Sequence, residues 1–60
     1  MTREDRRKQL IATAWRMIGD TGADTLSLGR LAARAGVTKP LVYGHFETRE
    51  GLLAELYRDF

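Results

Sequence analysis

The sequence predicts an all-α domain: a three-helix bundle of the homeodomain-like helix-turn-helix type, followed by the start of a fourth helix. Apolar residues recur at helical spacing in four segments, and none of these segments shows the alternation typical of a strand. A glycine or a capping residue separates each segment from the next. The 60 residues make one small domain, since a chain of this length buries only about 60% of its unfolded surface.

The first helix is predicted over Arg3–Thr21. Thr2 is its candidate N-cap, with Asp5 as a capping-box partner, and Gly22 ends it. A loop over residues 23–26 then leads to the second helix. The apolar side of the first helix, interpreted as core or inter-helix packing, comprises Leu10, Ile11, Ala14, Trp15, Met17 and Ile18.

Residues 27–46 predict two short helices joined by a tight turn. Ser27 is a strong N-cap for the first of them, and Gly36 stands where a left-handed residue closes a helix. The apolar stripe between them comprises Leu28, Leu31, Ala32 and Ala35. Thr38 is the candidate N-cap of the next helix, and Pro40 falls in its first turn, where a missing N–H is harmless. Helices joined so tightly form a helix-turn-helix, whose second helix is placed to enter a DNA major groove.

The third helix, predicted over Lys39–Phe46, has two different faces. Val42 and Phe46 lie within about 40° of each other on a helical wheel and are the expected core contacts. Leu41 and His45 flank that side. We interpret the arc of about 140° that carries Lys39, Pro40, Tyr43 and Gly44 as the outer face. A lysine beside a tyrosine on an outer face suits a polar, anionic partner.

Thr48 is the predicted N-cap of a fourth helix. The apolar residues that follow it repeat at helical spacing and are Leu52, Leu53, Leu56, Tyr57 and Phe60. Because this stripe is still running at the last residue, we expect the 60 residues to be one piece of a longer protein.

The positive charge is concentrated in the helix-turn-helix. The net charge of the chain is +2. Residues 25–49 hold four basic groups against one acidic group, whereas residues 50–60 hold one basic group against three acidic groups. An anionic partner such as DNA requires this distribution, although many solvated surfaces carry a similar excess.

Several polar residues have two interpretations. Tyr43 is either a half-buried aromatic with its hydroxyl in water or a phosphate contact beside Lys39. His45 either caps carbonyl groups at the end of its helix or contacts a phosphate. Arg49 stands against the dipole of the fourth helix, which indicates a phosphate contact made together with that helix N-terminus. The basic residues near the N-terminus either form a solvated or frayed helix start or act as an arm that contacts phosphates or the minor groove. They are Arg3, Arg6, Arg7 and Lys8.

The composition argues against several other classes of protein. There is no cysteine, and His45 has no second ligand with which to share a metal, so we expect neither a metal site nor a cofactor. No nucleophile–base pair, paired-carboxylate site or phosphate-binding glycine loop is present, so we expect no enzyme activity. The apolar runs are too short for a membrane span or a signal peptide, and we expect a cytoplasmic protein.

From Leu10 to Tyr57, the chain resembles the N-terminal domain of the TetR (tetracycline-repressor) family of bacterial transcriptional regulators. The resemblance lies in LIxxA and MIxxxG in the first helix, SLxxLAxxAGVTK from Ser27, LVYxHF from Leu41, and TRxxLL from Thr48. Any one of these segments is a weak signal, but their ordered combination with this spacing is highly specific.

The resemblance implies DNA contacts from eight residues: Ser27, Thr38, Lys39, Pro40, Leu41, Tyr43, His45 and Arg49. The family positions on phosphates match Ser27, Tyr43, His45 and Arg49, and those at base edges or the adjoining backbone match residues 38–41. This sequence departs from the family pattern at Gly29, where some members have a base-reading arginine. It also departs at Gly44, where a bulky aromatic or basic residue is common, so we expect both contacts to be absent.

We therefore expect sequence-specific binding to a palindromic double-stranded DNA operator, as the reading head of a transcriptional repressor. The resemblance also implies a C-terminal domain outside this chain, which binds a small-molecule inducer and forms a homodimer. Two alternatives stay open. Acidic catalytic residues downstream would favour the DNA-binding module of a recombinase or transposase, and a lack of salt-sensitive DNA affinity would favour a helical protein-interaction domain.

Overall fold

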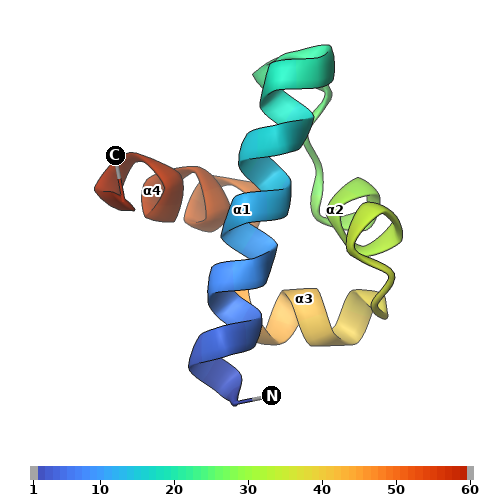
Figure 1. Cartoon of the computed structure of the whole chain (residues 1–60), viewed down its shortest axis with the longest axis vertical. Helices are drawn as coiled ribbons and strands as arrows, with labels where there is room; N and C mark the ends of the chain where they lie inside the picture. The colour runs from blue at the N-terminus through green and yellow to red at the C-terminus, as the bar shows by residue number, and fades with distance from the viewer. Residues whose placement is uncertain (1, 60) are drawn as a thin grey trace.

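The computed structural model describes residues 2–59 and confirms the all-α fold, with no strand among them. Its α-helices are α1 (Arg3–Thr21), α2 (Leu28–Ala35), α3 (Lys39–Phe46) and α4 (Arg49–Asp59) (Figure 1). The prediction of a plain loop after the first helix is wrong, because the short 3-10 helix η1 (Ala23–Thr25) occupies it. Phe60, predicted to continue the apolar stripe of α4, lies outside the described residues.

The longest helix, α1, stands at the centre of the domain (Figure 1). α2 packs against one side of α1, and α4 packs against another side. α3 contacts both α2 and α4 and lies near the N-terminal end of α1 (Figure 1). α3 is therefore supported by α2, by α4 and by the N-terminal end of α1, and its remaining side is uncovered.

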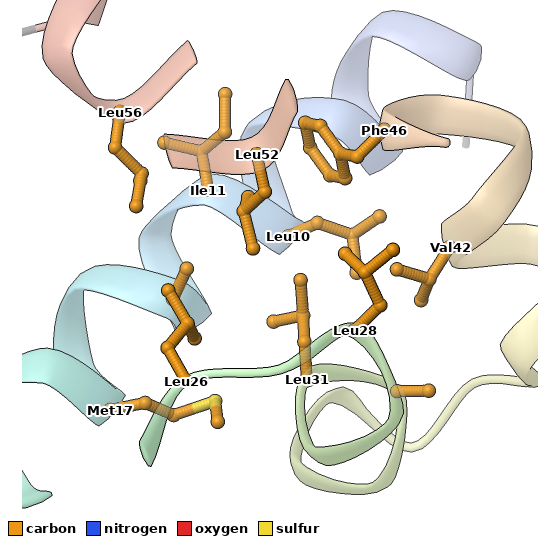
Figure 2. Close-up of a cluster of buried hydrophobic side chains, with 12 residues drawn as sticks. Leu10, Ile11, Met17, Leu26, Leu28, Leu31, Val42, Phe46, Leu52 and Leu56 are labelled. Carbon is orange, nitrogen blue, oxygen red and sulfur yellow. The ribbon is translucent and has the colours of Figure 1, made fainter. Parts of the chain in front are cut away.

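All four α-helices contribute to one hydrophobic core (Figure 2). Its buried side chains are Leu10, Ile11, Ala14, Met17, Leu26, Leu28, Leu31, Ala32, Val42, Phe46, Leu52 and Leu56. All but Leu26 come from the apolar stripes predicted for the helices, and Leu26 enters from the connection between η1 and α2. Across the described side chains, no polar or charged residue is buried, so apolar burial supplies the main stabilising term.

The turn between α2 and α3 closes as a Schellman motif. Gly36 has the left-handed backbone predicted for it, with φ 73° and ψ 31°. Its N–H donates to the carbonyl of Ala33 at 3.3 Å, and the N–H of Val37 donates to the carbonyl of Ala32 at 3.0 Å. Val37 also packs against the core, which is the hydrophobic contact that accompanies this motif. The turn thereby sets where α3 begins.

The predicted N-caps are confirmed at three helices and wrong in one respect at α3. A backbone N–H three residues on donates, at 3.0–3.1 Å, to the hydroxyl oxygens of Thr2, Ser27 and Thr48. Thr38 has the extended backbone of an N-cap, but its hydroxyl makes no capping hydrogen bond. Pro40 removes one of the two N–H groups that an N-cap oxygen normally accepts, and the other, that of Leu41, does not bond the Thr38 hydroxyl either.

A γ-turn centred on Glu47 joins α3 to α4. Glu47 has φ 46° and ψ −51°, and the N–H of Thr48 donates to the carbonyl of Phe46 across it. The first turn of α4 comes so close that a Cβ at Gly51 would lie 2.7 Å from the Phe46 carbonyl oxygen. The sequence does not signal this turn, because glutamate rarely adopts a positive φ.

Two aromatic residues that were assigned to apolar faces are exposed. Tyr57 is 73% exposed and Trp15 is 37% exposed. The buried side of α4 is the narrow stripe of Leu52 and Leu56, and Tyr57 lies about 140° from Leu52 around the helix axis. The prediction that Tyr57 extends the core stripe is therefore wrong, and Trp15 lies at the margin of the buried face of α1.

Candidate nucleic-acid interface

Five of the predicted DNA-contact residues, at the N-cap and along α3, are exposed, and together they are here called the outer face of α3. They are Thr38, Lys39, Pro40, Leu41 and Tyr43. Tyr43 is 46% exposed, whereas Phe46, three residues further along the same helix, is 4% exposed. Since Val42 is also fully buried, α3 is anchored by one side and presents polar and aromatic groups on the other.

Ser27 lies at the N-terminus of α2 and is half-buried. Its Oγ accepts the N–H of Arg30 at 3.1 Å, so the hydroxyl proton is left to donate to another group. The N-terminus of α2 also carries partial positive charge from the helix dipole. Both features suit an anionic oxygen such as that of a phosphate.

The cations of the helix-turn-helix differ in how far they are already engaged. The Arg34 guanidinium is paired with the Asp20 carboxylate, with 2.7 Å between Nη2 and Oδ2. Within the described part of the chain, Lys39 and Arg30 make no ion pair and no side-chain hydrogen bond. Lys39 is thus the unengaged cation on the outer face of α3.

Arg49 has a structural role that the sequence did not predict. Its Nε donates to the carbonyl of Leu26 at 2.7 Å, and its Nη2 donates to the carbonyl of Ala23 at 2.8 Å. These bonds explain why a basic residue stands at the N-terminus of α4, against the helix dipole. A phosphate contact from its remaining N–H groups stays a prediction.

The carbonyl at the end of α3 is capped by Arg3 rather than by His45. The Nη2 of Arg3 donates to the carbonyl of Gly44 at 2.9 Å, and no hydrogen bond from the imidazole of His45 is found within residues 2–59. Partial burial lowers the pKa of His45, and the nearby positive charges of Arg3, Arg7 and Arg6 lower it further. The lowered pKa favours the neutral imidazole in the free domain, and a neutral imidazole still has one N–H with which to donate to a phosphate.

The basic residues at the start of α1 are helical from Arg3 onward, so fraying is wrong, whereas the exposed Arg3 and Lys8 agree with a solvated helix start. Arg7 forms an ion pair with Glu55 of α4 and a second, longer one with Glu4 at 3.9 Å. Arg6 donates to the side chain of Gln9 at 2.8 Å. The Arg7–Glu55 pair joins α1 to α4, whereas the Arg6 bond stays within α1. An additional contact of these residues with DNA stays a prediction.

Comparison with known proteins decides which class of helix-turn-helix this is. The sequence profile described as "Bacterial regulatory proteins, tetR family" matches residues 10–56, which is most of the chain. This chain belongs to the tetR family. No solved structure gives a significant match.

Several curated relatives of the tetR-family domain are transcriptional regulators. The chain is 40% identical over 50 residues to Tetracycline repressor protein class C of Escherichia coli, covering 83% of this chain and 23% of that protein. It is 39% identical over 59 residues to the HTH-type transcriptional activator FasR of Mycolicibacterium smegmatis, covering 97% and 27%. With HTH-type transcriptional regulator AcrR of Shigella flexneri it shares 32% over 54 residues, covering 90% and 25%. The chain thus spans about a quarter of the length of these relatives.

Membership of the tetR family identifies the bundle as the N-terminal DNA-binding domain of that family. The relatives are regulators, and none is named as a recombinase, a transposase or another enzyme. Over residues 2–59, no helix combines the length and the apolar character that a membrane crossing requires. The same residues contain no group of three or more potential metal ligands.

Proposed function

We propose that this domain reads a specific operator sequence as part of a homodimeric transcriptional repressor. The observation that supports the proposal best is the outer face of α3, where the unengaged Lys39 and the exposed Leu41 and Tyr43 belong to one short helix. A lysine ammonium can donate to guanine O6 and N7 in the major groove, and a leucine side chain can pack on a thymine methyl. The Tyr43 and Ser27 hydroxyls are suited to phosphates, which fix the register of the protein on the duplex.

The operator would be palindromic, because a two-fold symmetric dimer presents the same helix to both half-sites. In this geometry the two copies of α3 enter successive major grooves, about 34 Å apart. A further domain outside this chain would hold the dimer together and bind the small-molecule inducer. Such a regulator would act in the bacterial cytoplasm, where it meets the chromosome.

The assignment as a repressor is supported by the likeness to a tetracycline repressor, whereas FasR, of similar identity, is named an activator. A reporter gene placed behind the selected operator distinguishes the two modes of regulation. For a repressor, we expect reporter expression to rise when the regulator is deleted. A fall in expression would identify an activator and would leave DNA recognition intact.

Selection from a randomised duplex pool, followed by a salt titration on the selected sequence, tests DNA recognition itself. If each subunit neutralises about three phosphates, the plot of log K against log[salt] should have a slope near −5. Arg58→Ala, at an exposed position near the end of α4, is the control and should keep that slope. A slope near zero with no selected sequence would reject the proposal and favour a protein-interaction role.

A further inference from the structure

Gly29, in the first turn of α2, lies against the side chain of Lys39 at the start of α3. A Cβ at Gly29 would lie 3.5 Å from Cε and 3.9 Å from Nζ of Lys39. The stem of the lysine therefore crosses α2 at the position where that helix has no side chain. The distances allow one methyl group in ordinary contact, but a longer side chain would compete for the space that the stem occupies.

The backbone at Gly29 does not itself require glycine. Gly22 and Gly36 have positive φ angles, whereas Gly29 lies inside a helix without one. Glycine is the least favourable helix residue apart from proline, so its presence here weakens α2. The structural feature that depends on it is the space taken by Lys39.

We propose that Gly29 is a positioning residue for Lys39 and that the two positions set one base preference together. This inference rests on the proposed function. A lysine side chain has four flexible bonds, so an isolated ammonium on a surface samples many positions. Since Lys39 has no ion pair or side-chain hydrogen bond within the described residues, contact with α2 at Gly29 is what restricts it.

The test is binding-site selection with the full chain in four forms: wild type, Lys39→Ala, Gly29→Leu and the double variant. Leucine at position 29 fills the space of the lysine stem and displaces the ammonium. Gly29→Leu should therefore lose about 10-fold discrimination at the same base pair as Lys39→Ala. In the Lys39→Ala background, Gly29→Leu should change the discrimination at that base pair by less than about twofold, because the lysine that it would displace is already gone. Gly29→Ala should select the wild-type sequence, because one methyl group fits beside the lysine stem in ordinary contact.

Melting temperatures separate this effect from loss of the fold. Leucine favours a helix more than glycine does, so Gly29→Leu should not lower the melting temperature. Gly29→Gln provides a polar side chain of similar length if the leucine variant aggregates. Gly19→Leu is the matched control, since Gly19 is an exposed helical glycine of α1 with no neighbouring atom within 4 Å of its Cβ position. It should select the wild-type sequence.

The remaining outcomes overturn one proposal or the other. If Lys39→Ala alters the selected sequence but Gly29→Leu does not, or if their effects add, Gly29 does not position Lys39. If Lys39→Ala leaves the selected sequence unchanged, the lysine does not read a base and the joint preference is rejected. If the wild type selects no sequence and binds DNA without salt dependence, the proposed function itself fails.

Discussion

The guanidinium of Arg49 donates to the backbone carbonyl of Leu26, with 2.7 Å between Nε and the oxygen. A second bond, from Nη2 to the carbonyl of Ala23, gives the arginine a two-point attachment. These bonds join the first residue of α4 to the segment that leads into α2. Arg49 therefore joins the segment that precedes the helix-turn-helix to the helix that follows it, whether or not it also touches DNA.

Arg49→Lys tests this attachment. Lysine keeps the positive charge, but its single ammonium cannot reproduce the planar fork that reaches both carbonyls. We expect the free energy of unfolding, measured with urea, to fall by about 1–2 kcal/mol. Arg16→Lys, at an exposed position of α1, is the matched control and should change little. If the stability of Arg49→Lys were unchanged, the two hydrogen bonds would not stabilise the domain, and only the positive charge of Arg49 could matter.

Phe46 and Tyr43 test the assignment of the two faces of α3. Phe46→Ala leaves a large cavity in the core and should destabilise the domain by about 3–5 kcal/mol, enough to unfold much of so small a protein. Tyr43→Phe removes only a hydroxyl from the exposed face and should leave the melting temperature nearly unchanged while weakening DNA binding. Thermal melts and binding titrations on both variants decide this. The opposite order of effects would mean that the two faces were assigned the wrong way round.

Local signals in the sequence were sufficient to predict the helices and most of their ends. Ser27 and Gly36 act within a few residues of themselves, so their roles can be predicted without knowing the fold. The contact of Arg3 with Gly44 joins residues 41 positions apart and exists only because the bundle brings α1 beside α3. The same holds for the attachment of Arg49. Such long-range polar contacts leave no periodic pattern, and the sequence therefore suggested a phosphate role for residues already bound to backbone.

The junction between α3 and α4 gives a pair of opposite predictions. Glu47→Gly should raise the free energy of unfolding by about 0.5–1 kcal/mol, because relief of the positive φ exceeds the added flexibility of glycine.

Gly51→Ala should lower the free energy of unfolding by about 1–3 kcal/mol, because the new Cβ meets the Phe46 carbonyl. Urea unfolding measures both.

Gly19→Ala is the control for the change from glycine to alanine in a helix with open space around it. It should raise stability by about 0.5–1 kcal/mol. If Gly51→Ala behaved like Gly19→Ala, the close approach of α4 to the end of α3 would be refuted.

His45 should make the stability of the domain depend on pH. Partial burial, followed by the charges of Arg3, Arg7 and Arg6, lowers the pKa of its imidazole below the ordinary value of 6.5. The unfolded chain therefore binds this proton more tightly than the folded domain does. Protonation of His45 therefore favours the unfolded chain. The contribution of the neutral imidazole to the free energy of unfolding is fully present above about pH 6.5, and it is lost as the pH falls through the lowered pKa of the folded state. Between about pH 7.5 and about pH 5, urea unfolding should show a larger loss of stability for wild type than for His45→Gln. Equal losses in both proteins would assign the acid sensitivity to other groups.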